Sequence, residues 1–153
     1  MNQKLMQTIE ADHLRAMEWV DKAQEAKRRG DGDAVSRNFT EAFRLEKQAA
    51  EAMLPYLDVE PTRSILLRSA AALALECQRS EEAERLACLG LSGKPPVEIR
   101  AELRDVLMTL WQPVSLRQAS SAMITNGRPA RATCSSTGTR SCTKLIFLSV
   151  IKM

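Results

Sequence analysis

Residues 61–96 have the sequence PTRSILLRSAAALALECQRSEEAERLACLGLSGKPP, which predicts two short helices folded back on each other. Pro61 suits the first turn of a helix, where its missing N–H group would be unpaired anyway. The alanine-rich run at residues 70–74 has a high helix propensity. Because Ala70, Ala71 and Ala74 carry little side chain, we expect a neighbouring backbone to approach this side of the helix closely.

The second helix of this hairpin is predicted to begin at Ser80. Its hydroxyl can accept a hydrogen bond from an early backbone N–H group, and Glu81 and Glu82 suit the positive end of the helix dipole. Gly93 is a good terminator, and Pro95-Pro96 prevents continuation. The apolar stripe has three- and four-residue spacing and consists of Ala83, Leu86, Ala87, Gly90 and Leu91.

This hairpin resembles the tetratricopeptide repeat, a helix-turn-helix unit with a period of about 34 residues. In that family a small residue of the first helix faces an alanine twelve positions on, and a proline closes the unit. Ala71, Ala83 and Pro95 match these three places. The chain departs from the family at Gln78, where the turn usually has glycine, and at Leu67, where tryptophan is frequent.

An upstream stretch resembles the same repeat, which implies a second unit. The matching residues are Trp19, the small residue Ala23, the turn glycine Gly30, and the second-helix residues Phe39 and Ala42. Val35 replaces the expected alanine, and no proline follows until Pro55. Ala23 and Ala71 are 48 positions apart, so we expect the second helix of this unit to extend to Met53 or Leu54.

The remaining helices follow from hydrophobic spacing. A first helix is expected from about Gln3 to Arg29, and Asp33 can cap the next one. A fifth helix after Pro96 would cover the last hairpin, because repeat arrays need such caps. Its apolar residues are Ile99, Leu103, Val106, Leu107, Leu110 and Trp111. The predicted fold is therefore all-α, with about five helices in tetratricopeptide-like antiparallel pairs over residues 5–111.

Charge divides the chain into two predicted parts. Residues 1–112 contain 16 Lys and Arg against 19 Asp and Glu, a balance of −3, whereas residues 113–153 contain six basic residues and no acid. We predict a helical domain at residues 1–112 and an irregular, poorly ordered basic tail rich in Ser and Thr at residues 113–153. A further hypothesis is that a reading-frame change produced this tail, since the acids end abruptly at Asp105.

The tail ends in an apolar run at residues 145–151, too short for a bilayer span, which needs roughly 20 residues. A strand, a loosely docked segment and an aggregation-prone end are all compatible with it. The amino terminus lacks a run apolar enough for a secretory signal. A cytoplasmic protein with no membrane span is the expectation.

No motif in the sequence predicts catalysis. Glu10 and His13 have the Glu-x-x-His spacing of di-iron bundles, but such a site needs two of these motifs, and His13 is the only histidine. We therefore expect a helix-face histidine, no metal and no cofactor. Nucleophile elbows, phosphate-binding loops and dinucleotide fingerprints are absent from the sequence, and the expectation is a protein that is not an enzyme.

The four cysteines, Cys77, Cys88, Cys134 and Cys142, show no Cys-x-x-Cys pairing typical of zinc sites. Cys77 and Cys88 are predicted to be small buried hydrophobic residues of the hairpin. A structural disulfide is not expected in a reducing compartment.

The tetratricopeptide resemblance implies a scaffold or adaptor that binds a peptide or a partner helix in a groove lined by the first helix of each unit. The residues placed on that groove are Gln24, Lys27, Arg28 and Arg68. The alternative for these side chains is an ordinary solvated face. The family's chaperone-binding clamp is not expected, because its places hold Val20, Asp21 and Gln24 here.

Two other activities remain open. The basic tail can bind nucleic acid or another anionic surface through phosphate contacts, although no aromatic residues are interleaved with its charges. Those basic residues are Arg117, Arg128, Arg131, Arg140, Lys144 and Lys152. A homodimer that buries incompletely capped ends is the other possibility.

Overall fold

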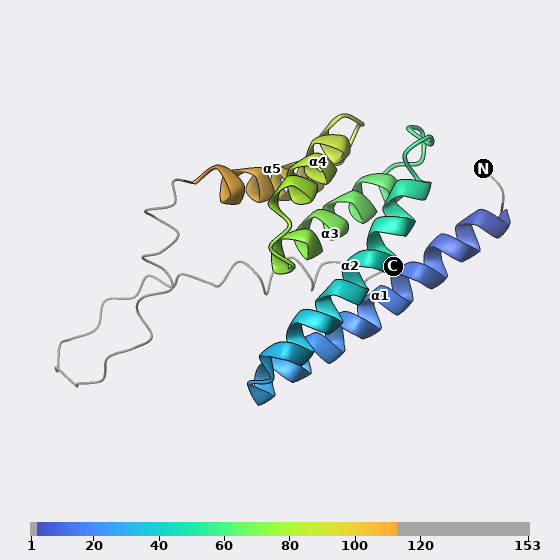
Figure 1. The fold of residues 1–153 in the computed structure, drawn as a ribbon. Coiled ribbons are helices and arrows are strands. Elements are labelled where there is room, and N and C mark those ends of the chain that lie inside the picture. Colours follow the sequence, from blue (N-terminus) through green and yellow to red (C-terminus); the bar gives the residue numbers. More distant parts are fainter. Residues whose placement is uncertain (1–2, 113–153) are drawn as a thin grey trace, which may run out of the picture. The chain divides into compact units, whose positions relative to one another are not determined.

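The computed structural model describes residues 3–112, and contacts between residues divide the chain between Leu110 and Trp111. Across the described residues the chain forms five helices and no strand (Figure 1). They are α1 (Gln3–Arg29), α2 (Gly32–Ala52), α3 (Thr62–Glu76), α4 (Ser80–Leu91) and α5 (Val97–Trp111). The all-α prediction is confirmed, whereas the expectations for residues 113–153 lie outside the described residues.

The first two helices form a long antiparallel pair, joined by a tight turn at Gly30 (Figure 1). Gly30 has a φ of +74°, and its N–H group donates to the carbonyl of Lys27, while that of Asp31 donates to Ala26. These two bonds make the left-handed glycine termination common at helix ends. The residue that caps α2 is Asp31, whose carboxylate accepts from the Ala34 N–H group at 3.0 Å, so the prediction of Asp33 as the cap was wrong.

The second pair, α3 and α4, closes with the same turn built on a different residue. Gln78 has a φ of +58°, the Gln78 N–H group donates to Leu75, and that of Arg79 donates to Ala74. A glutamine therefore occupies the left-handed position that glycine holds in the first pair.

Helix α4 begins at Ser80 as predicted, but the residues at the N-terminal ends of α3 and α4 play other roles than expected. The N-cap of α4 is Arg79, whose side chain makes no capping hydrogen bond, so Ser80 is the first helical residue and not a cap. Pro61 precedes α3 as its N-cap residue instead of lying in the first turn. Both differences leave the orientation of the helices as expected.

Helix α3 lies at the centre of the fold, and eleven of its fifteen residues are buried. Ala71 in α3 and Ala83 in α4 are both fully buried, as expected for a pair of helices pressed together along alanines. The side chain of Leu103 in α5 fills the space beside Gly90 of α4, because a Cβ atom added at Gly90 would stand 2.8 Å from the Cδ1 atom of Leu103. The absence of a side chain at Gly90 thus makes room for Leu103, which is itself buried.

The two turns generate a matched pair of stability predictions. Gly30→Ala should lower the free energy of unfolding by about 1 kcal/mol, since the left-handed conformation disfavours a Cβ atom. No atom lies within 4 Å of that Cβ position, so the loss reports the backbone alone. Gln78→Gly should raise the free energy of unfolding by about 0.5–1 kcal/mol, because relief of the same penalty exceeds the added entropy of the unfolded chain. Urea denaturation measures both, and a loss of stability in Gln78→Gly would contradict this account.

Candidate functional site

Three of the four residues predicted to bind a partner lie together near the end of α1. Lys27 and Arg28 are exposed in its last turn, and Gln24 is half-buried one turn earlier. Arg28 pairs with Glu25 on the same helix. These side chains share one end of α1, and no described hollow includes them.

Arg68, the fourth predicted residue, lies elsewhere and is buried. It is only 2% exposed and forms an ion pair with Glu102 of α5 at 2.6 Å. The structure therefore places this guanidinium between helices and not on a surface that a ligand reaches. Sequence spacing alone gave no sign of this burial, because Glu102 comes from a helix 34 residues further along the chain.

The side chain of His13 in α1 contacts the carboxylate of Glu46 in α2. Its Nδ1 atom lies 2.9 Å from one carboxylate oxygen of Glu46 in α2 and 3.1 Å from the other, and Glu46 is fully buried. The hydrogen bond to Glu46 raises the pKa of His13 above its ordinary value of 6.5, although burial and the positive charge of Arg68 oppose the rise. Glu10, the other member of the sequence pattern, is exposed.

Neither histidine nor cysteine builds a metal centre in the part of the chain that the structure describes. No group of three or more His, Cys, Asp or Glu side chains is placed to hold an ion there. Cys77 is half-buried, which raises the pKa of its thiol, whereas Cys88 is exposed. The prediction of a buried Cys88 was therefore wrong, since that position of α4 faces away from α3.

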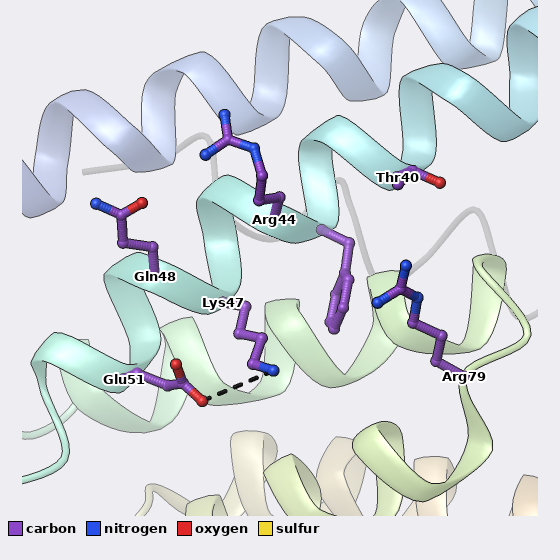
Figure 2. Close-up of a pocket in the computed structure, with 7 residues that line it drawn as sticks. Thr40, Arg44, Lys47, Gln48, Glu51 and Arg79 are labelled. Carbon is purple, nitrogen blue, oxygen red and sulfur yellow. Dashed lines mark ion pairs between the residues drawn. The ribbon is translucent and has the colours of Figure 1, made fainter.

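A hollow lined by four charged side chains lies along α2 and has a volume of about 610 Å³ (Figure 2). We call it the α2 hollow. Arg79 reaches it from the turn between α3 and α4, and α2 supplies the other lining residues: Thr40, Phe43, Arg44, Lys47, Gln48 and Glu51. Three cationic side chains and one carboxylate thus surround a single cavity.

One edge of the α2 hollow, at Lys47 and Glu51, is held by ion pairs to α4. Lys47 lies 2.9 Å from Glu82 and 3.9 Å from Glu51, the latter pair drawn in Figure 2. Arg85 completes the network by contacting Glu51 at 2.7 Å and Glu82 at 3.1 Å. The hydrogen bond from Lys47 is the main cause of the lowered pKa of Glu82. Lys47 is therefore largely neutralised by its neighbours.

The two arginines that line the α2 hollow differ in their contacts. Arg44 pairs with Glu41 of its own helix at 3.1 Å. Arg79 is exposed, forms no ion pair within residues 3–112, and has its guanidinium 5.3 Å from the centroid of the Phe43 ring. Phe43 is only 2% exposed and forms part of the floor. The α2 hollow consequently has its available positive charge on Arg79.

Sequence analysis missed this hollow. One signal was present, because Thr40, Arg44, Lys47 and Gln48 recur at three- and four-residue spacing on one face of a helix. The contribution of Arg79 is a tertiary feature, since the turn between α3 and α4 brings it to α2. Periodicity within one segment cannot place that residue.

No protein-family model, curated protein or solved structure matches the chain. The resemblance to tetratricopeptide repeats therefore stays a prediction based on the residues given above.

The pair formed by His13 and Glu46 generates a prediction about pH. Because folding raises the pKa of His13, the pair stabilises the fold fully below about pH 6.5, and that contribution is lost as the pH rises through the raised pKa. Unfolding by urea should therefore become easier above neutrality in the wild type. His13→Asn keeps a hydrogen-bond donor but does not titrate, so its stability should vary less over the same range.

The pKa of His13 can also be measured directly, because it is the only histidine in the chain. An NMR titration of its ring protons should give a pKa above 6.5. A value at or below 6.5 would contradict the pairing with Glu46.

Proposed function

We propose that the helical part of the chain is a protein-interaction scaffold of tetratricopeptide type that binds an extended segment of a partner protein. The observation that carries binding is the α2 hollow, which lies on the second helix of the first pair and not on the groove that the family's first helices would line; three cations, a carboxylate, a hydroxyl and an amide surround a volume of about 610 Å³ there. This volume lies in the usual range for small-molecule and cofactor sites.

The chemistry of the α2 hollow suits binding. Thr40 contributes a hydroxyl oxygen that can accept, because its proton is donated to the Ser36 carbonyl at 2.8 Å, and Arg44, Lys47, Arg79 and Gln48 offer several N–H donors. Such donors match backbone carbonyls and side-chain carboxylates of a peptide. A binding scaffold rather than an enzyme is therefore the activity that we propose, with no cofactor.

The cluster at the end of α1 is a second candidate contact surface for the same function. Gln24, Lys27 and Arg28 stay in the proposal as residues that a partner can reach. Arg68 does not, because its charge is engaged by Glu102.

The alternative function is binding of nucleic acid or another anionic surface by the basic tail. It rests on the six basic residues and the absence of acids in residues 113–153. Within residues 3–112 no helix has the length and apolar character to cross a bilayer. Cytoplasmic location and a homodimer remain expectations from the sequence.

Site-specific photo-crosslinking in the native cell tests the scaffold proposal. Benzoylphenylalanine placed at Gln48, on the rim of the α2 hollow, should give a discrete protein adduct. The same group at Lys27 tests the end of α1, and a third at Arg104, an exposed residue of α5, serves as the control. We expect an adduct at Gln48 and none at Arg104. Equal labelling at all three positions would contradict a defined binding surface.

Deletion of residues 113–153 separates the two functions. The scaffold proposal predicts that the Gln48 adduct persists, because every residue of the α2 hollow lies before residue 80. The alternative predicts loss of salt-sensitive binding to a labelled oligonucleotide, since phosphate contacts release counterions. An adduct that disappears on deletion, with helical content unchanged by circular dichroism, would count against the scaffold.

A further inference from the structure

We propose that the partner is an extended acidic peptide that lies along α2, passes over Thr40 and places carboxylates near Arg37 and Arg79. This inference rests on the proposed function and specifies its partner. The inference is supported by two neighbouring hollows on α2, by the charges that line them and by Thr40, which lines both.

A second hollow adjoins the first. It has a volume of about 430 Å³ and is lined by Trp19, Ser36, Arg37, Asn38, Thr40 and Glu41. Thr40 lines both this hollow and the α2 hollow. The two hollows therefore meet at one side chain, and we call them together the track; Trp19 of α1 lines one of them and Arg79, in the turn between α3 and α4, lines the other.

The length of the track fits a short peptide. Its lining residues on α2 run from Ser36 to Glu51, and fifteen steps along a helix at about 1.5 Å each cover about 22 Å. An extended chain advances about 3.3 Å per residue. A segment of about seven residues is therefore long enough to lie in both hollows at once.

The charges of the track indicate an acidic occupant. Within residues 3–112, neither Arg37 in the second hollow nor Arg79 in the first forms an ion pair, and both are exposed. Lys47 is already bound by Glu82 and Glu51, and Arg44 by Glu41. The two available guanidinium groups thus belong to different hollows, which share Thr40. Arginine binds carboxylates with paired N–H donors, which makes spaced Asp or Glu side chains the matching groups.

A peptide fits this surface better than a nucleic acid does. Glu41 lies in the lining of the second hollow and Glu51 in that of the α2 hollow, so an uninterrupted row of phosphates along α2 would also meet carboxylates. Single strands also need exposed aromatic rings for stacking. Phe43 is 2% exposed, and the ammonium group of Lys22 lies 4.0 Å from the centroid of the Trp19 ring. A peptide can space its charges to avoid the acids.

Selection from a random heptapeptide display library tests the inference with the full-length protein. Peptides retained by the wild type should be enriched in Asp and Glu. The affinity of a selected peptide, measured by fluorescence polarisation, should fall about tenfold in Arg37→Gln/Arg79→Gln, because both carboxylate contacts are lost. The matched control is Arg15→Gln/Arg104→Gln, which removes two exposed arginines on α1 and α5 and should leave the affinity unchanged.

A blocking variant tests the passage over Thr40. Thr40→Glu places a carboxylate where the hollows meet, and it should abolish binding of the same peptide. Its urea midpoint and circular dichroism establish that the helices remain folded. If that variant proves unfolded, Thr40→Gln, which adds bulk without charge, should weaken binding in its place.

The outcomes separate this inference from the function on which it rests. Selected peptides that are neutral or basic, or whose binding ignores Arg37→Gln/Arg79→Gln, would overturn the acidic partner and leave peptide binding in place. A library that yields no peptide above background would overturn the scaffold proposal itself. Displacement of the peptide by a twelve-residue oligothymidylate, or by millimolar inorganic phosphate, would assign the track to a general anion site and also overturn the inference.

Discussion

The enclosure of α3 by its neighbours is the constraint on which the rest of the structure depends. This helix carries two buried arginines, and each is held by a different helix: Arg63 donates to the carbonyl of Leu89 in α4 at 3.0 Å, and Arg68 pairs with Glu102 in α5 at 2.6 Å. Leaving a buried charge without its partner costs about 3–5 kcal/mol. Alanine packing brings the helices close, but small apolar side chains allow one helix to slide along another. The buried arginines prevent this sliding, because each must keep its partner, so they fix the register of α4 and α5 against α3.

A second set of charges joins the first helix pair to the second. Lys47 in α2 contacts Glu82 in α4, and Arg85 returns to Glu51. These side chains are partly exposed, so each pair alone contributes little, about 0–1 kcal/mol. Their effect is geometric, because the network holds one edge of the α2 hollow in place. The same contacts neutralise Lys47, which leaves the free positive charge of the surface to arginines outside the network.

The sequence predicted the helices well because their signals are local. The bounds of α1, the end of α2 within one or two residues, and the turn at Gly30 follow from hydrophobic spacing and glycine. Contacts between helices carry no such signal. Two contacts depend on how the helices pack: the hydrogen bond between His13 and Glu46, which are 33 residues apart, and the ion pair that buries Arg68 against Glu102. Arg68 is an example, since an arginine is ordinarily solvated. Only its ion pair with Glu102 on α5 offsets the cost of burying its charge.

Contacts between helices also explain why α2, rather than the end of α1, is the better candidate for binding a partner. Lys27 and Arg28 are long, exposed side chains in a last helical turn, and a ligand that binds them must first restrict their rotamers. Around the α2 hollow, much of that restriction already exists in the free protein. Phe43 is buried in the floor, Lys47 is tied to Glu82, and the guanidinium of Arg79 lies against the aromatic ring. Prior ordering of the site lowers the entropy lost on binding, so equal charge gives higher affinity on α2 than at the exposed end of α1.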